Sequence, residues 1–159
     1  MASNRHLGRI IALQTLYEYD FRENAGDDTV ELDEVLGRNL ERYEDTIDDK
    51  DFVDKLVHGA GSKLKELDAT IQPIAPEWPL DQISRIDLTI LRLALFELLH
   101  MQELVPPKVA INEAVELAKA FGGDNSSKFV NGVLGTAYRT LIEGQPNDSR
   151  EPAKSAEEL

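Results

Sequence analysis

A chain of 159 residues is long enough to bury a hydrophobic core, and we expect one domain or two helical halves packed together. It contains no cysteine, which excludes disulfides, zinc–thiolate sites and thiol nucleophiles, and no two of its three histidines are close enough in sequence to suggest a metal pair. The net charge is −13, but residues 23–51 alone hold twelve acidic against three basic residues, so the total charge does not exclude a nucleic-acid partner.

The N-terminus lacks the apolar core of a signal peptide, and no uncharged run approaches the length that crosses a bilayer. We therefore expect a soluble cytoplasmic protein without a membrane segment. The histidine spacing also gives no reason to expect a metal or cofactor.

Residues 3–21 are predicted to form a helix whose many apolar residues require contact on more than one side. Arg5 and Arg9 lie four residues apart in its opening turns, where the helix dipole makes cations mildly unfavourable. That small cost suggests an anion such as a phosphate, to which a protonated His6 would add. The alternative, that the arginines only keep the terminus soluble, is equally compatible with the pattern.

The next segments predict an acidic amphipathic helix over 29–44 and another helix over 50–69, interrupted by Gly59 and Gly61. The string IQPIAPEWPL, with three prolines, then predicts a connector between two helical halves. We expect Trp78 within it to fill the seam between those halves as a core residue.

Ser84 and Asp87 match a capping box at the start of a helix over residues 85–101. This helix is apolar nearly all round, which predicts either the central helix of a bundle or a face covered by a partner protein. Arg92 within it requires a carboxylate or carbonyl partner and is interpreted as structural.

Residues 106–141 read as two helices around a glycine-marked turn. Pro106 and Pro107 favour a helix start, and Gly122 and Gly123 are expected to end that helix in the left-handed conformation. One of Asp124, Asn125 and Ser126 is expected to cap the second helix. Its predicted buried residues recur at helical spacing: Val130, Val133, Leu134, Ala137 and Leu141.

Phe129 does not fit that apolar stripe. It lies one step to the side of Val130, with Lys128 toward solvent. An aromatic ring beside a lysine and a helix N-terminus suits base stacking and phosphate binding, although the pattern alone favours ordinary packing on a neighbouring helix. Beyond this pair of helices, residues 144–159 have the composition of a disordered acidic tail.

Sequence motifs for catalysis are missing. The chain has no strand–turn–helix phosphate loop, no serine nucleophile elbow and no histidine–metal spacing, and its thirty carboxylates are too frequent to mark a catalytic pair. We therefore expect an all-helical, non-enzymatic adaptor that binds protein, RNA or both.

Three strings make the resemblance to a known family specific: ALQTLY at 12–17, LRLALFELL at 91–99 and PPKVAINEAVELAKAFGGDNSSKFVNGVL at 106–134. Over residues 5–141 the chain resembles the NusB family of bacterial transcription antitermination factors. The resemblance implies an all-α fold of about seven helices, in a domain over 1–143 with helical halves at 1–72 and 80–143. It also implies a non-enzymatic role in which boxA single-stranded RNA of ribosomal RNA operons is bound together with ribosomal protein NusE, within the RNA polymerase antitermination complex.

The resemblance carries specific residues with it. The implied RNA-binding residues are Arg5, His6, Arg9, Gln14, Tyr17, Asn125, Ser126, Lys128 and Phe129. The implied NusE surface is the outer side of the helix that opens at Arg85, with Asp87, Leu88 and Leu91. Family members often have a denser arginine run than Arg5–Arg9 and an acid where Asn125 stands, so we expect weak RNA binding by this protein alone and greater reliance on NusE.

Two other functions are compatible with such a helical chain. One is a protein-binding adaptor without an RNA role. The other is the RNA-binding domain of ribosomal RNA cytosine methyltransferases, although we expect no cofactor domain in a chain ending at Leu159. A homodimer that masks the RNA surface is left open by the sequence.

Overall fold

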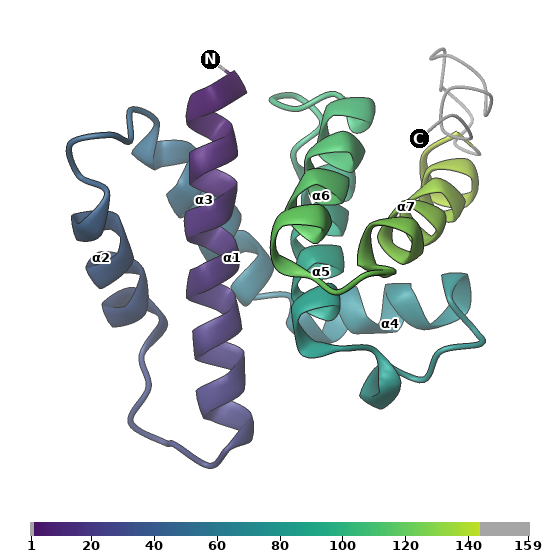
Figure 1. The fold of residues 1–159 in the computed structure, drawn as a ribbon, viewed down its shortest axis with the longest axis horizontal. Helices are drawn as coiled ribbons and strands as arrows, with labels where there is room; N and C mark the ends of the chain where they lie inside the picture. Colours follow the sequence, from purple (N-terminus) through teal and green to yellow (C-terminus); the bar gives the residue numbers. More distant parts are fainter. Residues whose placement is uncertain (1, 144–159) are drawn as a thin grey trace. The chain divides into compact units, whose positions relative to one another are not determined.

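The computed structural model describes residues 2–143, with side chains from Arg5 onward; the tail predicted over 144–159 lies outside them. The described residues form seven α-helices and no strand, which confirms the all-α fold (Figure 1). The chain divides into two compact units, Met1–Leu64 and Lys65–Leu159, and each is described separately. Their boundary precedes the proline-rich connector over 73–79 at which the sequence suggested a division.

Unit 1 is built around α1 (Ala2–Asn24), with α2 (Leu32–Arg42) and α3 (Lys50–Gly61) packed against it (Figure 1). Glycines allow the close contacts. A Cβ atom at Gly8 would lie 3.0 Å from Val53 Cγ2 on α3, and one at Gly61 would lie 2.9 Å from Leu32 Cδ2. Gly61 therefore permits the close approach of α3 to α2.

Polar side chains join α1 to α2 along one side of unit 1. Arg38 donates to both carboxylate oxygens of Glu18, at 2.7 and 3.0 Å, and Arg22 donates to the same carboxylate at 2.9 Å. The hydrogen bond from Arg38 is the main reason that the pKa of Glu18 is lowered. A buried hydrogen bond of 3.0 Å from Asn39 Nδ2 to Thr15 Oγ1 lies in the same seam.

Unit 2 contains α4 (Leu64–Ile74, apart from its first residue), a 3-10 turn (Leu80–Gln82), α5 (Arg85–His100), α6 (Pro107–Phe121) and α7 (Ser126–Ala137). Every residue of α5 from Asp87 to Leu98 is buried, and α5 contacts both α6 and α7. The interpretation of this helix as a central one is therefore confirmed. Arg92 is tolerated there because Asp68 of α4 accepts two hydrogen bonds from its guanidinium group, at 2.7 and 2.8 Å.

The predicted helix over 50–69 is two helices, separated at Ser62 and Lys63. The second, α4, then continues through Pro73 to Ile74. Leu67, Ile71 and Ala75 follow one another at intervals of four residues, and all three are buried. Burial of this apolar stripe favours a helix that continues to the start of the proline-rich segment.

The end of α7 also differs from the predicted pattern. A π-helical turn at Tyr138–Ile142 inserts one extra residue per turn, which rotates the following side chains. As a result Ile142 is fully buried, whereas Leu141, which we predicted to be buried, is partly exposed. The other four predicted positions of the stripe are buried.

Among the described residues, no helix combines the length and the apolar character needed to cross a membrane.

The side chain of His58 on α3 lies between two carboxylates. Its Nε2 contacts Asp33 Oδ1 and its Nδ1 is 3.1 Å from Asp54 Oδ1. The hydrogen bond with Asp33, more than the nearby charge of Asp54, raises the pKa of His58 above its ordinary value of 6.5. Protonated His58 therefore holds α2 and α3 together.

Because the pKa is raised on folding, this stabilisation is complete below the unfolded value of 6.5 and is lost as the pH rises through the folded value. We expect His58→Gln to lower the free energy of unfolding at about pH 5.5 and to have little effect at about pH 9. Urea unfolding of both proteins at the two pH values measures this, and an equal loss at both would contradict the assignment.

Candidate functional site

The turn between α6 and α7 is shaped by a close contact at Gly122. A Cβ atom at this position would lie 2.4 Å from both Cβ and Oγ of Ser126 and 2.8 Å from the Ala118 carbonyl oxygen. Gly122 has φ −93° and ψ −171°, and Gly26 is the only described residue with positive φ, so the expected left-handed stop at Gly122 and Gly123 was wrong. Gly122 is required for space rather than for its backbone conformation.

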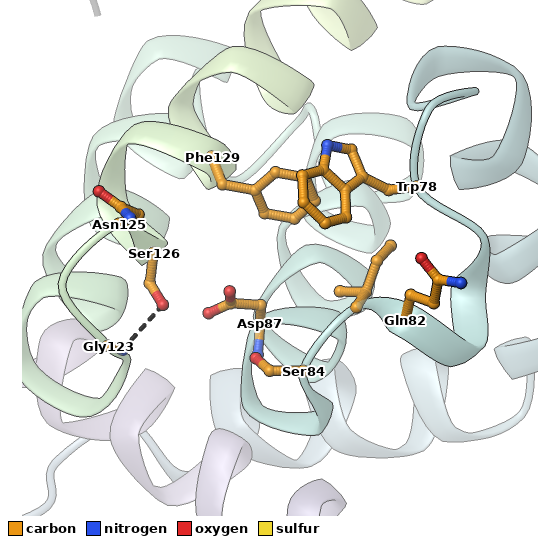
Figure 2. A pocket seen from close by; sticks show the side chains of 9 residues that line it. Trp78, Gln82, Ser84, Asp87, Gly123, Asn125, Ser126 and Phe129 are labelled. Atoms are coloured by element: carbon orange, nitrogen blue, oxygen red, sulfur yellow. Dashed lines mark hydrogen bonds between the residues drawn. The ribbon is translucent and has the colours of Figure 1, made fainter.

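Ser126 closes this turn from the other side. Its Oγ accepts a hydrogen bond of 2.9 Å from the Gly123 amide, drawn as a dashed line in Figure 2. Asn125, one of the three residues predicted to cap α7, is its N-cap residue. Its side chain, however, makes no capping hydrogen bond. The first turn of α7 therefore starts without a side-chain cap from Asn125.

A cavity of about 330 Å³ opens next to this turn, and every residue that lines it belongs to unit 2 (Figure 2). It is formed where the turn before α7, the start of α5 and the segment after α4 come together. The lining residues are Trp78, Gln82, Ile83, Ser84, Asp87, Gly123, Asn125, Ser126 and Phe129.

Two aromatic rings form one wall of the cavity. Trp78 and Phe129 meet edge to face, with their ring centroids 5.8 Å apart and their planes at 72°. Phe129 is half-buried, but 47% of Trp78 is exposed, so the expectation that Trp78 is a core residue was wrong. Helix α4 ends at Ile74 and the prolines at 76 and 79 keep the next residues out of regular helix, which leaves the indole at the surface of unit 2.

The start of α5 supplies the polar side of the cavity. Ser84 is the N-cap residue, and its hydroxyl accepts a hydrogen bond of 3.2 Å from the Asp87 amide, which is half of the predicted capping box. The carboxylate does not complete the other half. Asp87 is only 8% exposed, and its Oδ1 atom is buried without a hydrogen-bond partner in the described part of the chain.

The predicted protein-partner residues are largely enclosed. Leu88 is 8% exposed and Leu91 is fully buried, because both lie on the part of α5 that is packed within unit 2. Leu91 thus offers no surface to a partner. The accessible residues at this end of α5 are Ser84 and Arg85.

In unit 1, two predicted arginines converge on one aromatic ring. The guanidinium carbons of Arg5 and Arg9 each lie 5.0 Å from the ring centroid of Phe52 on α3. Arg5 also lies 3.7 Å from the carboxylate of Asp49, while Arg9 is only 3% exposed. Arg5 is therefore the accessible member of the pair, and Arg9 lies beneath the surface.

The other predicted residues of α1 are His6, Gln14 and Tyr17. His6 and Gln14 are half-buried, and the buried amide oxygen of Gln14 has no hydrogen-bond partner among the described residues. Tyr17 is 36% exposed and stacks on Phe21, with the rings 11° from parallel and their centroids 6.4 Å apart. Phe21 was not among the predicted site residues, although its spacing of four from Tyr17 indicates a shared helix face.

The structure thus brings together three of the predicted RNA-binding residues of unit 2. Asn125, Ser126 and Phe129 line the same cavity, whereas Lys128 is exposed on α7 and does not line it. Sequence reasoning missed Trp78, Gln82 and Ile83 as cavity residues. The proline spacing around Trp78 was the available signal, since it argues against a regular helix and hence against deep burial.

The close contact at Gly122 can be tested with a matched pair of glycines. We expect Gly122→Ala to destabilise the protein by about 1–3 kcal/mol, because the new methyl group overlaps Ser126 and the α6 backbone. Gly123→Ala should change stability much less, since a Cβ there meets no atom within 4 Å and the amide that donates to Ser126 is retained. Thermal unfolding compares the two, and an equal effect of both substitutions would contradict this explanation.

Comparison with known proteins is consistent across sequence and structure. The chain is 46% identical over 150 residues to the transcription antitermination protein NusB of Chloroflexus aggregans, covering 93% of this chain and 96% of that protein. It matches the structure of T. maritima NusB with a TM-score of 0.72 and 31% identity, over 98% of this chain and 97% of the other. A crystal structure of antitermination factors NusB and NusE in complex with double-stranded RNA matches with a TM-score of 0.73 and 26% identity, over 87% and 98% of the two chains.

The NusB family model matches residues 6–139, which include eight of the nine predicted RNA-binding residues, all except Arg5. Together with the curated relatives, this match shows that the chain belongs to the NusB family.

Proposed function

We propose that this chain is a non-enzymatic transcription antitermination factor that binds boxA-type single-stranded RNA of ribosomal RNA operon transcripts together with ribosomal protein NusE. The observation that carries this proposal is the open cavity at the start of α7, where two aromatic rings, an amide side chain and a hydroxyl line one space. Single-stranded RNA is recognised by stacking of unstacked bases on aromatic rings and by hydrogen bonds to their edges.

The start of α7 also suits the RNA backbone. The N-terminus of a helix carries a partial positive charge, and the Asn125 side chain makes no capping bond there, so its amide remains available to a ligand. Lys128, exposed on the first turn of α7, adds a positive charge that can approach a phosphate. Base contacts in the cavity and phosphate contacts on α7 would thus come from adjacent residues.

In unit 1 we assign the second part of the RNA contact to the exposed and half-buried residues of α1. Arg5 and His6 are suited to phosphate, and Gln14 and Tyr17 to a base edge and a base face. Arg9 is buried, so we assign it a supporting role: its guanidinium group packs over the ring of Phe52. This arrangement provides few accessible cations, which agrees with weak RNA binding in the absence of NusE.

The partner protein is supported by the matched crystal structure, which contains NusB with NusE and RNA. We place NusE contact at the start of α5, on Ser84 and Arg85 next to Asp87 and Leu88, and leave Leu91 out because it is buried. Assembly with RNA polymerase at nascent transcripts in the cytoplasm follows from this role. A homodimer that covers the proposed RNA surface would compete with RNA binding.

A gel shift with boxA-like single-stranded RNA, with and without NusE, tests the proposal. We expect little retardation by this protein alone and a clear complex when NusE is added, with a scrambled RNA of the same composition as the control. Absence of any complex under both conditions would favour a helical protein adaptor without an RNA role.

Substitution of Phe129 distinguishes a role in base stacking from a role in core packing. We expect Phe129→Ala to weaken RNA binding in the presence of NusE by roughly 1–3 kcal/mol, the value typical of one base stacked on an aromatic ring. Phe129→Tyr keeps the ring and should retain binding, and circular dichroism should show intact helices for both variants. Unchanged affinity of Phe129→Ala, or loss of its helical signal, would show that Phe129 serves the core instead.

A further inference from the structure

The side chain of Arg5 lies against a ring and a carboxylate that both come from the start of α3. Its guanidinium carbon is 5.0 Å from the ring centroid of Phe52, and its Nε atom is 3.7 Å from Asp49 Oδ2. The side chains of Arg5 and Asp49 are 31% and 39% exposed, so the ion pair lies at the surface of unit 1. Two residues that sequence reasoning did not assign to the site therefore act on a residue predicted to bind phosphate.

Both residues of α3 are fixed by the local structure. Asp49 is the N-cap residue of α3, and its Oδ1 atom accepts a hydrogen bond of 3.0 Å from the Phe52 amide. The ring of Phe52 is buried and also contacts the guanidinium group of Arg9. A carboxylate that caps a helix cannot turn away from an approaching anion without losing the cap. Asp49 therefore keeps its negative charge next to Arg5 when this guanidinium binds another group.

The contact between Arg5 and Asp49 is an ion pair without a hydrogen bond. Its N–O distance of 3.7 Å exceeds the roughly 2.7–3.2 Å of an N–H···O hydrogen bond. Exposed ion pairs of this kind contribute little to stability, whereas a guanidinium binds a phosphate through short, charge-assisted hydrogen bonds. An RNA phosphate can therefore replace Asp49 as the main anion of Arg5.

We propose that Asp49 takes the place of an RNA phosphate next to Arg5 in the RNA-free protein and thereby lowers the affinity of unit 1 for RNA. This inference rests on the proposed function and adds a residue that regulates it. Arg5 is the fourth residue of α1, where the helix dipole favours a nearby anion. Asp49 supplies that anion within the protein, so RNA must compete with it for Arg5. The charge of Asp49 thus contributes to weak RNA binding in the absence of NusE.

The substitution Asp49→Asn separates the charge from the helix cap, because an asparagine side chain accepts the same hydrogen bond at an N-cap. Fluorescence anisotropy measures binding of labelled boxA-like single-stranded RNA in the presence of NusE, at about 50 mM and about 200 mM salt. We expect Asp49→Asn to bind roughly three- to tenfold more tightly at the lower salt concentration, because a negative charge beside the bound phosphate is removed. The slope of log K against log salt should become steeper by up to about 0.7, the value for one phosphate of a single strand.

Asp51→Asn is the matched control. Asp51 is exposed in the first turn of α3 and, among the described residues, forms no ion pair with Arg5, so we expect a change below about twofold. In the background of Arg5→Gln, the gain from Asp49→Asn should disappear, since the two residues act as a pair. Asp49→Ser, which also caps a helix without a charge, should give the same gain as Asp49→Asn. Circular dichroism verifies that each variant keeps its helices.

Unchanged RNA affinity of both folded Asp49 variants would overturn the proposal. Weaker binding by them would also overturn it and would show that Asp49 positions Arg5 for RNA instead. A gain of equal size in Asp51→Asn, or one that persists with Arg5→Gln, would replace it with a general charge effect. Absence of a complex with boxA RNA and NusE, for the unchanged protein and the Asp49 variants alike, would reject the proposed function itself.

Discussion

The burial of α5 on all sides is the constraint on which the cavity of unit 2 depends. Each fully buried leucine or isoleucine of this helix stabilises the fold by roughly 1.5–3 kcal/mol, and the residues from Asp87 to Leu98 are buried without a break. The two hydrogen bonds from Arg92 to Asp68 attach α4 to the same helix. A helix held in this way cannot shift along its axis, so the position of its first turn is fixed.

The cavity lies where the start of α5, the start of α7 and the segment after α4 meet. The α5 start presents Asp87 to the cavity, while the close approach of Gly122 to Ser126 determines where α7 begins. Trp78 reaches the same space from the proline-rich segment after α4. Three segments distant in sequence thus place a carboxylate, a hydroxyl and two aromatic rings around one opening, on rigid supports, which is how a binding site gains selectivity.

Much of this could be predicted from the sequence, because helical periodicity and capping residues are local signals. The proline start of α6, the Ser84 cap and four of the five predicted stripe residues of α7 were predicted correctly. The errors arose where a non-local contact decides the outcome. Ile142 replaces Leu141 in the core because of a π-helical turn, and Gly122 is required by Ser126 and not by its own φ angle.

The candidate site was predicted only in part for the same reason. Phe129 stood out because it left the apolar stripe, and Asn125 and Ser126 because they followed a glycine turn. Trp78 was assigned to the core from its residue type, and Asp87 to a protein surface, since no sequence pattern shows that both line one cavity with Phe129. Leu91 was assigned with them although its packing within unit 2 leaves it no exposed surface.

The central claim is that RNA occupies the cavity of unit 2. Its most direct test is an NMR titration of the isotope-labelled protein with boxA RNA in the presence of unlabelled NusE. The account predicts that the indole N–H of Trp78 and the amides of Gly123, Asn125 and Phe129 show the largest shifts. Shifts that leave Trp78 and the α7 start unchanged, while RNA binds elsewhere, would contradict it.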